Sequence, residues 1–132
     1  MQTPRNVIED LYAAIAARDM QRAAGHLDPD ADFYITPGLP HQDPFYKGRD
    51  AFVNGVWKQL KMTYVPNIQA QISEYLSGTD VVTVIGRYIG TAMTGRAIDI
   101  GFVHAWTVRS GHVIALQVHT DAPSWNRALA TP

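Results

Sequence analysis

The sequence contains no cysteine, which excludes a disulfide framework, a thiolate metal site and a cysteine nucleophile. Charged residues are also few, at 17%, and eleven basic side chains nearly balance twelve acidic ones. With no basic stripe or acidic tail, we expect no nucleic-acid partner. Long apolar runs are missing, and the first residues lack the basic-then-apolar order of a signal peptide. We therefore expect a cytoplasmic protein that does not contact a membrane.

The composition that remains is that of one folded domain. Hydrophobic residues make up 46% of the 132 residues, which is enough to bury a core without covalent staples. No internal repeat, low-complexity tract or linker divides the chain. The sequence therefore predicts a single domain over residues 1–132.

Helical periodicity is typical of the first half. Apolar residues recur on one face of a first helix, which Thr3 is suited to cap and in which Pro4 fits the first turn. Asp19 predicts a second cap, opening a short helix that runs through Leu27. A third helix is predicted to start near Arg49.

Turn-forming residues separate these helices. Residues 28–30, Asp-Pro-Asp, predict a break in the chain, and residues 32–36 a short strand. The loop over residues 38–48 is rich in turn formers but also holds two aromatic residues and a histidine. Loops of this length in a compact domain are often functional. His41 and Asp43 are candidates for its pocket-facing side chains, although a solvated pair is the simpler interpretation.

The second half is rich in strands. Alternation and β-branched residues predict four consecutive strands followed by a short helix, over residues 68–73, 81–91, 97–109, 113–120 and 124–130. Short turns between consecutive strands require antiparallel pairing, and helices gathered on one side give an α+β class. Gly86, Gly90 and Gly101 allow sharp bends. We predict a cone-shaped α+β barrel, in which a strongly curved antiparallel or mixed sheet wraps the N-terminal helices and encloses a pocket.

Several segments, in this order and spacing, carry a family resemblance that covers nearly the whole chain. They are residues 8–14, 18–19, 37–38, 46–51, 86–91, 94–96, 102–111 and 120–121. Together they resemble the SnoaL-like branch of the nuclear transport factor 2-like (NTF2-like) superfamily, which includes ketosteroid isomerase, limonene epoxide hydrolase and scytalone dehydratase. The resemblance implies the cone-shaped fold. It leaves the reaction open, because one fold hosts many chemistries.

His104 is the leading candidate for acid–base chemistry. Strand alternation places it on the same face as Phe102 and Trp106, which belong in the interior. A neutral imidazole there offers one donor and one acceptor, which suits proton transfer. The alternative is a structural histidine bonded to Tyr88 or to a backbone carbonyl. The resemblance implies a strand position similar to that of the protonated, hydrogen-bond-donating aspartate of ketosteroid isomerase.

Two tyrosines complete the predicted catalytic set of His104, Tyr88 and Tyr12. Tyr88 lies between Gly86 and Gly90, which leave space for its phenol to donate to a carbonyl oxygen. The resemblance matches Tyr12 to the first-helix tyrosine that neighbours the oxyanion-binding tyrosine of ketosteroid isomerase. Core packing with a bonded hydroxyl is the alternative for Tyr12.

The predicted substrate-binding residues are mostly apolar or aromatic. They are Tyr34, Thr36, Trp57, Phe102, Trp106, Leu116 and Val118. The resemblance places Thr36 where ketosteroid isomerase has its general base. It places Val118 where limonene epoxide hydrolase and SnoaL-type cyclases have an inward acid. The chain therefore departs from these relatives at both carboxylate positions.

No metal or cofactor site is expected. His119 and Asp121 share one face of their strand, but alternation separates them from His104. No glycine-rich phosphate loop follows a strand before a helix, so nucleotide binding has no support either.

We therefore predict a cofactor-independent acid–base enzyme of the isomerase, dehydratase or cyclase type. Its substrate is expected to be a small hydrophobic molecule with a carbonyl or hydroxyl group. The alternative is a non-catalytic ligand-binding or dimerisation module of the same fold. The outer sheet face, which carries Val103, Ala105, Thr107 and Gln117, is predicted to pair with a second copy.

Overall fold

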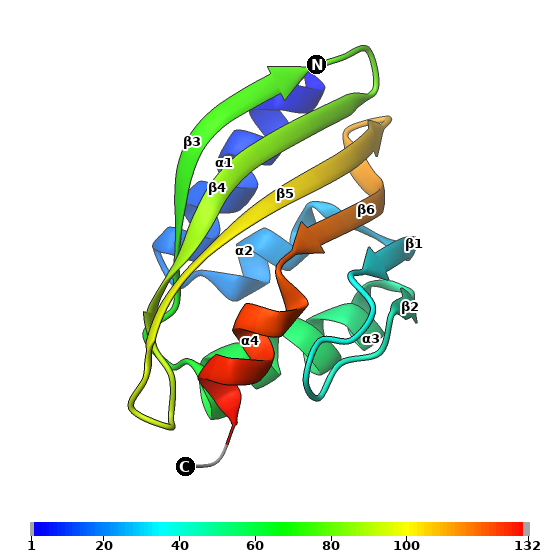
Figure 1. Ribbon diagram of the computed structural model, residues 1–132. Coiled ribbons are helices and arrows are strands. Elements are labelled where there is room, and N and C mark those ends of the chain that lie inside the picture. Colours follow the sequence, from blue (N-terminus) through cyan, green and yellow to red (C-terminus); the bar gives the residue numbers. More distant parts are fainter. Residues whose placement is uncertain (1, 131–132) are drawn as a thin grey trace.

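The computed structural model describes residues 2–130 as a curved mixed sheet packed against helices (Figure 1). The helices are α1 (Pro4–Ala16), α2 (Met20–Gly25), α3 (Arg49–Phe52) and α4 (Ala122–Leu129), and α3 continues into the π-helical segments η1 (Val53–Trp57) and η2 (Leu60–Tyr64). The strands are β1 (Leu27–Ile35), β2 (Phe45–Lys47), β3 (Gln69–Ser77), β4 (Val81–Thr91), β5 (Ala97–Arg109) and β6 (His112–Thr120).

The helix starts follow the predicted capping residues. The Thr3 hydroxyl accepts a hydrogen bond from the backbone N–H of Asn6 at 3.1 Å, and the Asp19 carboxylate accepts one from that of Arg22 at 3.1 Å. The α1 residues Val7, Ile8, Leu11 and Tyr12 are buried. Their burial confirms the predicted face and points Tyr12 at the sheet.

The sheet confirms the predicted α+β class. Its strand order is β2-β1-β6-β5-β4-β3, and all neighbours are antiparallel except β1 and β6, which are parallel. Because β2 and β3 remain at the two edges, the sheet is not closed into a barrel. Curvature alone produces the concave face: in Figure 1, β3, β4 and β5 curve around α1, which lies behind them.

Close packing at Gly86 accompanies this curvature. The β3–β4 pairing shifts register between Ile72 and Glu74, directly beside the partners of Gly86. A Cβ atom on Gly86 would lie 2.4 Å from the backbone oxygen of Gln71 and 2.7 Å from the Phe102 ring. Only glycine fits between the bulged neighbour strand and the aromatic ring.

The prediction of a break at residues 28–30 is wrong, because these residues lie inside β1. The pairing of β1 with β6 shifts register between Leu27 and Asp32. Pro29, which has no N–H to donate, lies in this irregular stretch. The strand therefore continues through the turn-forming residues while its ladder is interrupted there.

An ion-pair cluster joins α1 to α2 and to His26, the residue that follows α2. The Asp10 carboxylate accepts hydrogen bonds from the Arg22 guanidinium and lies 2.6 Å from Nε2 of His26. These contacts, led by Arg22, lower the pKa of Asp10 to about 2. The cluster therefore links α1 to α2 through a side chain outside the buried face of α1.

The core consists of two groups of buried side chains. The larger lies between α1, the helix from α3 onward and the sheet, and includes Phe33 stacked on Phe52 with ring centroids 4.1 Å apart. The smaller contains Ile98 and Trp125 at the α4 end. Leu39, Leu60 and Tyr88 pack against both groups. These three bridging residues mark the level of the fold at which the cavity lies.

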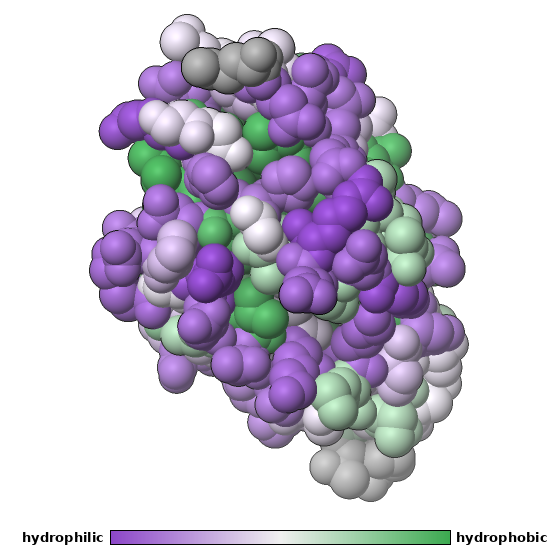
Figure 2. Space-filling view, turned by 180° about the vertical axis from the view of Figure 1, so that it is seen from behind, coloured by the Kyte–Doolittle hydropathy of each residue, from purple (hydrophilic) through white to green (hydrophobic). Residues whose placement is uncertain are grey.

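The face turned away from the viewer in Figure 1 carries mainly hydrophilic side chains, with separate hydrophobic areas between them (Figure 2). Within residues 2–130, no helix has the length and apolar character needed to cross a membrane. The described residues also contain no group of three or more His, Asp or Glu side chains arranged to hold a metal ion.

Candidate active site

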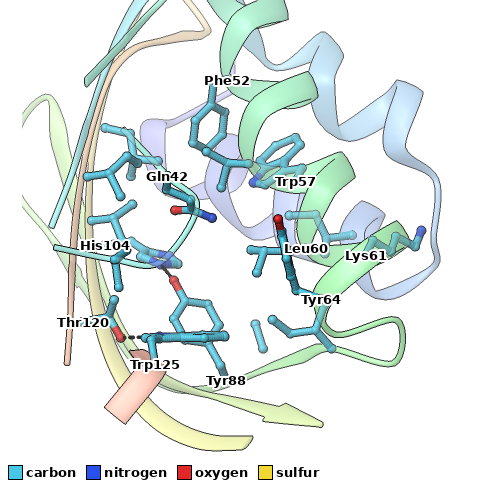
Figure 3. A pocket seen from close by; sticks show the side chains of 18 of the residues that line it. Gln42, Phe52, Trp57, Leu60, Lys61, Tyr64, Tyr88, His104, Thr120 and Trp125 are labelled. Atoms are coloured by element: carbon cyan, nitrogen blue, oxygen red, sulfur yellow. Dashed lines mark hydrogen bonds between the residues drawn. The ribbon is translucent and has the colours of Figure 1, made fainter. Parts of the chain in front are cut away.

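A cavity of about 120 Å³ lies between the concave sheet face and the helices. Its size is near that of an engineered protein cavity of about 150 Å³ that binds benzene. Aromatic and aliphatic side chains form most of the wall (Figure 3). All three tryptophans of the chain line it: Trp57, Trp106 and Trp125. The cavity therefore suits a compact, largely apolar molecule.

Seven of the predicted site residues meet at this cavity. They are Tyr12 from α1, Trp57 from η1, Tyr88 from β4, His104 and Trp106 from β5, and Leu116 and Val118 from β6. The alternation argument for β5 is confirmed, because Phe102, His104 and Trp106 are buried while their neighbours are half-buried.

Three predicted binding residues do not line the cavity. Tyr34 is 47% exposed on the opposite sheet face, since its neighbours Phe33 and Ile35 take the inward positions. Thr36 donates to the Val118 carbonyl at 2.8 Å and accepts from a β6 backbone N–H, so it joins β1 to β6 instead. Phe102 lies behind His104, with ring centroids 3.9 Å apart.

His104 is held between two tyrosine hydroxyls. Its Nδ1 lies 2.6 Å from the Tyr12 oxygen, and its Nε2 lies 2.6 Å from the Tyr88 oxygen. Trp106 donates its indole N–H to the same Tyr12 oxygen at 2.9 Å. Four side chains from three elements thus form one continuous chain of hydrogen bonds, and Figure 3 shows the bond between His104 and Tyr88 beside the open space.

The tautomer of His104 gives this chain its direction. With the imidazole proton on Nε2, His104 donates to the Tyr88 oxygen and accepts at Nδ1 from Tyr12, whose oxygen accepts from Trp106. The Tyr88 proton then has no acceptor among the described residues and is available to a molecule in the cavity. With the imidazole proton on Nδ1, both bonds reverse, and the proton left over is that of Tyr12, which also lines the cavity.

Burial keeps all three titrating groups uncharged. Removal from water, with a smaller contribution from the charge of His119, lowers the pKa of His104 to about 3. Burial also raises the pKa of Tyr88 and of Tyr12 well above the ordinary value. The site is therefore a set of neutral donors at physiological pH.

The cavity wall contains residues that the sequence reasoning did not select. Leu60 and Tyr64 from η2 and Gln42 from the loop between β1 and β2 all line it. The signal for two of them was present, because Trp57, Leu60 and Tyr64 recur at helical spacing. No periodic pattern marks Gln42, whose position depends on the loop conformation.

Charge at the cavity has one sign. The lining residues include Arg18 and Lys61 but, within the described part of the chain, no aspartate or glutamate. Lys61 directs its ammonium group away from the cavity in Figure 3. The chemistry available inside is therefore hydrogen-bond donation from neutral groups, without a carboxylate base.

The sequence model of the SnoaL-like domain matches residues 8–116. The chain belongs to the SnoaL-like domain family. Among curated proteins, none matches this SnoaL-like domain.

Solved structures confirm its NTF2-like fold. An NTF2-like protein from Burkholderia thailandensis shares 24% identity at a TM-score of 0.90, covering 98% of this chain and 99% of that one. An NTF2-like protein of unknown function from Burkholderia pseudomallei shares 21% identity at a TM-score of 0.89, with coverages of 99% and 100%. TerC, co-crystallised with polyporic acid, shares 19% identity at a TM-score of 0.84, with coverages of 96% and 97%.

Proposed function

We propose that this SnoaL-like domain is a cofactor-independent enzyme acting on a small hydrophobic molecule with a carbonyl or hydroxyl oxygen. Isomerisation, dehydration and cyclisation all develop negative charge on such an oxygen. The observation that carries the proposal is the hydrogen-bond chain from Trp106 through Tyr12 and His104 to Tyr88. With His104 protonated on Nε2, this chain ends with the Tyr88 hydroxyl as a free donor at an apolar cavity, which is the arrangement of an oxyanion-binding site.

Tyr88 is the residue that touches the substrate oxygen. Its hydroxyl donates to that oxygen, and the bond strengthens as charge develops there in the transition state. The largely apolar wall raises the value of this bond, because a low dielectric strengthens electrostatic interactions. Removing one such donor from an oxyanion site typically costs a factor of about 100 to 1000 in rate.

His104 supports Tyr88 in its neutral form. Its pKa of about 3 makes it a weak base, and both ring nitrogens already have partners. If Tyr88 passes its proton to the substrate oxygen, His104 passes its Nε2 proton to the Tyr88 oxygen. Tyr12 then passes its proton to Nδ1 of His104, so that the imidazole stays neutral. The negative charge then lies on the Tyr12 oxygen, which keeps the Trp106 N–H bond. Because burial disfavours tyrosinate there, we assign the chain to polarising the substrate rather than to lasting proton removal.

A structural relative supports a small-molecule ligand. TerC was co-crystallised with polyporic acid, an organic molecule, and it shares the fold of this chain over nearly its whole length. The apolar cavity between sheet and helices gives this chain a comparable place to hold such a molecule.

The test begins with a thermal-shift screen of apolar ketones and lactones, in which a ligand of the folded state raises the melting temperature. On any compound that is turned over, Tyr88→Phe should lower kcat by about 100-fold or more while retaining the ring. Tyr34→Phe is the matched control, because Tyr34 lies on the outer face. Full turnover by Tyr88→Phe would refute the assigned role. If His104→Ala retained full turnover, His104 would have no role in the reaction.

We also propose that two copies pair through the outer sheet face. Figure 1 shows no helix, among the described residues, in front of β3, β4 and β5. Two large hydrophobic side chains lie exposed on these strands, since Leu76 is 48% and Val81 38% exposed. A second copy of the chain, paired through the same face, would cover these side chains. This surface is what favours the alternative function, a dimerisation module.

Solution mass tests the pairing directly. Sedimentation equilibrium should give twice the chain mass for the native protein, and Ala105→Glu, in the middle of β5, should give a monomer. Gln21→Glu, at an exposed position on α2 and away from the sheet face, is the control. A monomeric native protein would refute the proposal.

A further inference from the structure

The polar groups on the far side of the cavity form a second contact point for the ligand. Gln42 projects its carboxamide from the β1–β2 loop into the open space, and Tyr64 lies along the helical wall with its hydroxyl toward the same space (Figure 3). Both face the wall that holds His104 and Tyr88. Neither polar end has a hydrogen-bond partner among the described residues, and neither is buried, so both are accessible to a ligand.

The loop that carries Gln42 is held in place at several points. Asn126 on α4 donates to the Gly38 carbonyl at 2.8 Å, and the Pro44 carbonyl accepts from a β1 backbone N–H at 2.9 Å. Between these anchors, His41 stacks on Tyr64 with ring centroids 4.8 Å apart and planes 6° apart. Gln42 follows His41 directly, so its position is tied to that of Tyr64.

Two other polar residues of the wall, Thr120 and Tyr12, are already hydrogen-bonded. The Thr120 hydroxyl donates to the Gly101 carbonyl at 2.8 Å and lies 3.2 Å from the Trp125 indole nitrogen, from which it accepts. The Tyr12 oxygen is used by Trp106 and His104. Among the described residues that line the cavity, the uncharged polar groups with no hydrogen bond to the protein are those of Gln42, Trp57, Tyr64 and Gln69. Gln42 and Tyr64 are the two whose oxygen atoms face the open space across from Tyr88 in Figure 3.

We propose that Gln42 and Tyr64 together bind a second oxygen function of the ligand, so that the site selects planar aromatic ketones carrying a hydroxyl away from the carbonyl. This inference rests on the proposed function, because it takes the ligand carbonyl to lie on Tyr88. The aromatic wall favours a flat ring, and the carboxamide with the phenol can both donate to and accept from a hydroxyl. Entering the cavity strips water from that hydroxyl, which is favourable only if protein partners replace the water.

Calorimetry with matched single-ring probes tests this. Hydroxyacetophenone and methylacetophenone, each as the meta and the para isomer, differ only in a hydroxyl or a methyl of similar size. One hydroxyl isomer should bind about threefold to tenfold more tightly than its methyl counterpart, as expected for one net hydrogen bond. The double variant Gln42→Leu, Tyr64→Phe should remove that preference, measured as the ratio of the hydroxyacetophenone and methylacetophenone affinities within the same variant. The single variant Gln42→Ala, which keeps Tyr64, should reduce the preference for the hydroxyl compound without removing it.

The control is Gln21→Leu, an exposed glutamine on α2, which should retain the preference. If the methyl compounds bind as tightly as the hydroxyl compounds, or if the double variant keeps the preference, the second contact point is refuted. Tyr88→Phe separates this result from the proposed function. It should weaken both members of a pair equally, and unchanged affinity for both would instead overturn the role of Tyr88. Absence of binding by every probe would overturn both proposals.

Discussion

Acidification should destabilise this protein through one buried imidazole. His104 is only 7% exposed, and burial lowers its pKa from 6.5 to about 3. The unfolded chain therefore binds a proton below pH 6.5 that the folded chain refuses until about pH 3. Stability is fully present above the unfolded pKa and is lost as the pH falls through this window.

The slope follows from the same shift. Each pH unit in the window costs up to about 1.4 kcal/mol, so lowering the pH from 6.5 to about 4.5 removes roughly 2 to 3 kcal/mol. Most carboxylates titrate below this range, which leaves the imidazole as the main contributor.

Urea unfolding at a series of pH values measures this slope. His104→Gln keeps a donor and an acceptor but cannot titrate, so it should flatten the curve. His112→Gln, at an exposed histidine after the β5–β6 turn, should leave the slope as in the native protein. NMR gives a second readout without any variant, because the His104 ring signals should not titrate between about pH 5 and 8. A slope equal in native protein and His104→Gln, or a ring that titrates near its ordinary pKa, would refute the reasoning.

Two further substitutions test the packing around the site. Tyr12→Phe leaves the indole N–H of Trp106 and one imidazole nitrogen without partners, so it should cost about 2 to 4 kcal/mol in urea unfolding. A loss below about 0.5 kcal/mol would contradict the hydrogen-bond chain. Gly86→Ala puts a Cβ 2.4 Å from the backbone oxygen of Gln71 and should cost about 1 to 3 kcal/mol. Gly25→Ala, whose Cβ meets nothing within 4 Å, is the matched control and should be neutral or slightly stabilising.

Much of the fold was predictable because local patterns and global packing agree. Thr3 and Asp19 cap helices as expected, and the predicted long strands coincide with β4 and β5. The errors lie where a local signal was overridden. The Asp-Pro-Asp stretch reads as a turn, yet it stays in β1 because neighbouring apolar residues are buried against α3 and β6. Barrel closure was not decided by any local pattern, since it depends on whether β2 and β3 meet.

The candidate site divides in the same way. Alternation in β5 was sufficient to place His104 and Trp106 inward. Tyr34 was predicted to face inward, but the sequence did not show which residues of its strand face the core. Because side chains alternate between faces, an error of one residue places a side chain on the opposite face. Gln42 was not selected, since a loop side chain obeys no period.

Residue periodicity and capping chemistry were enough to determine the element order, the α+β class and the inward direction of His104, because they depend on neighbours within a few positions along the chain. Tertiary structure alone decided that the two nitrogens of His104 meet Tyr12 and Tyr88, which are 92 and 16 residues away in sequence. It also decided the depressed pKa of His104, since desolvation is set by everything packed around the ring. Contacts between distant segments follow from how curved surfaces fit together, and no local pattern encodes that fit.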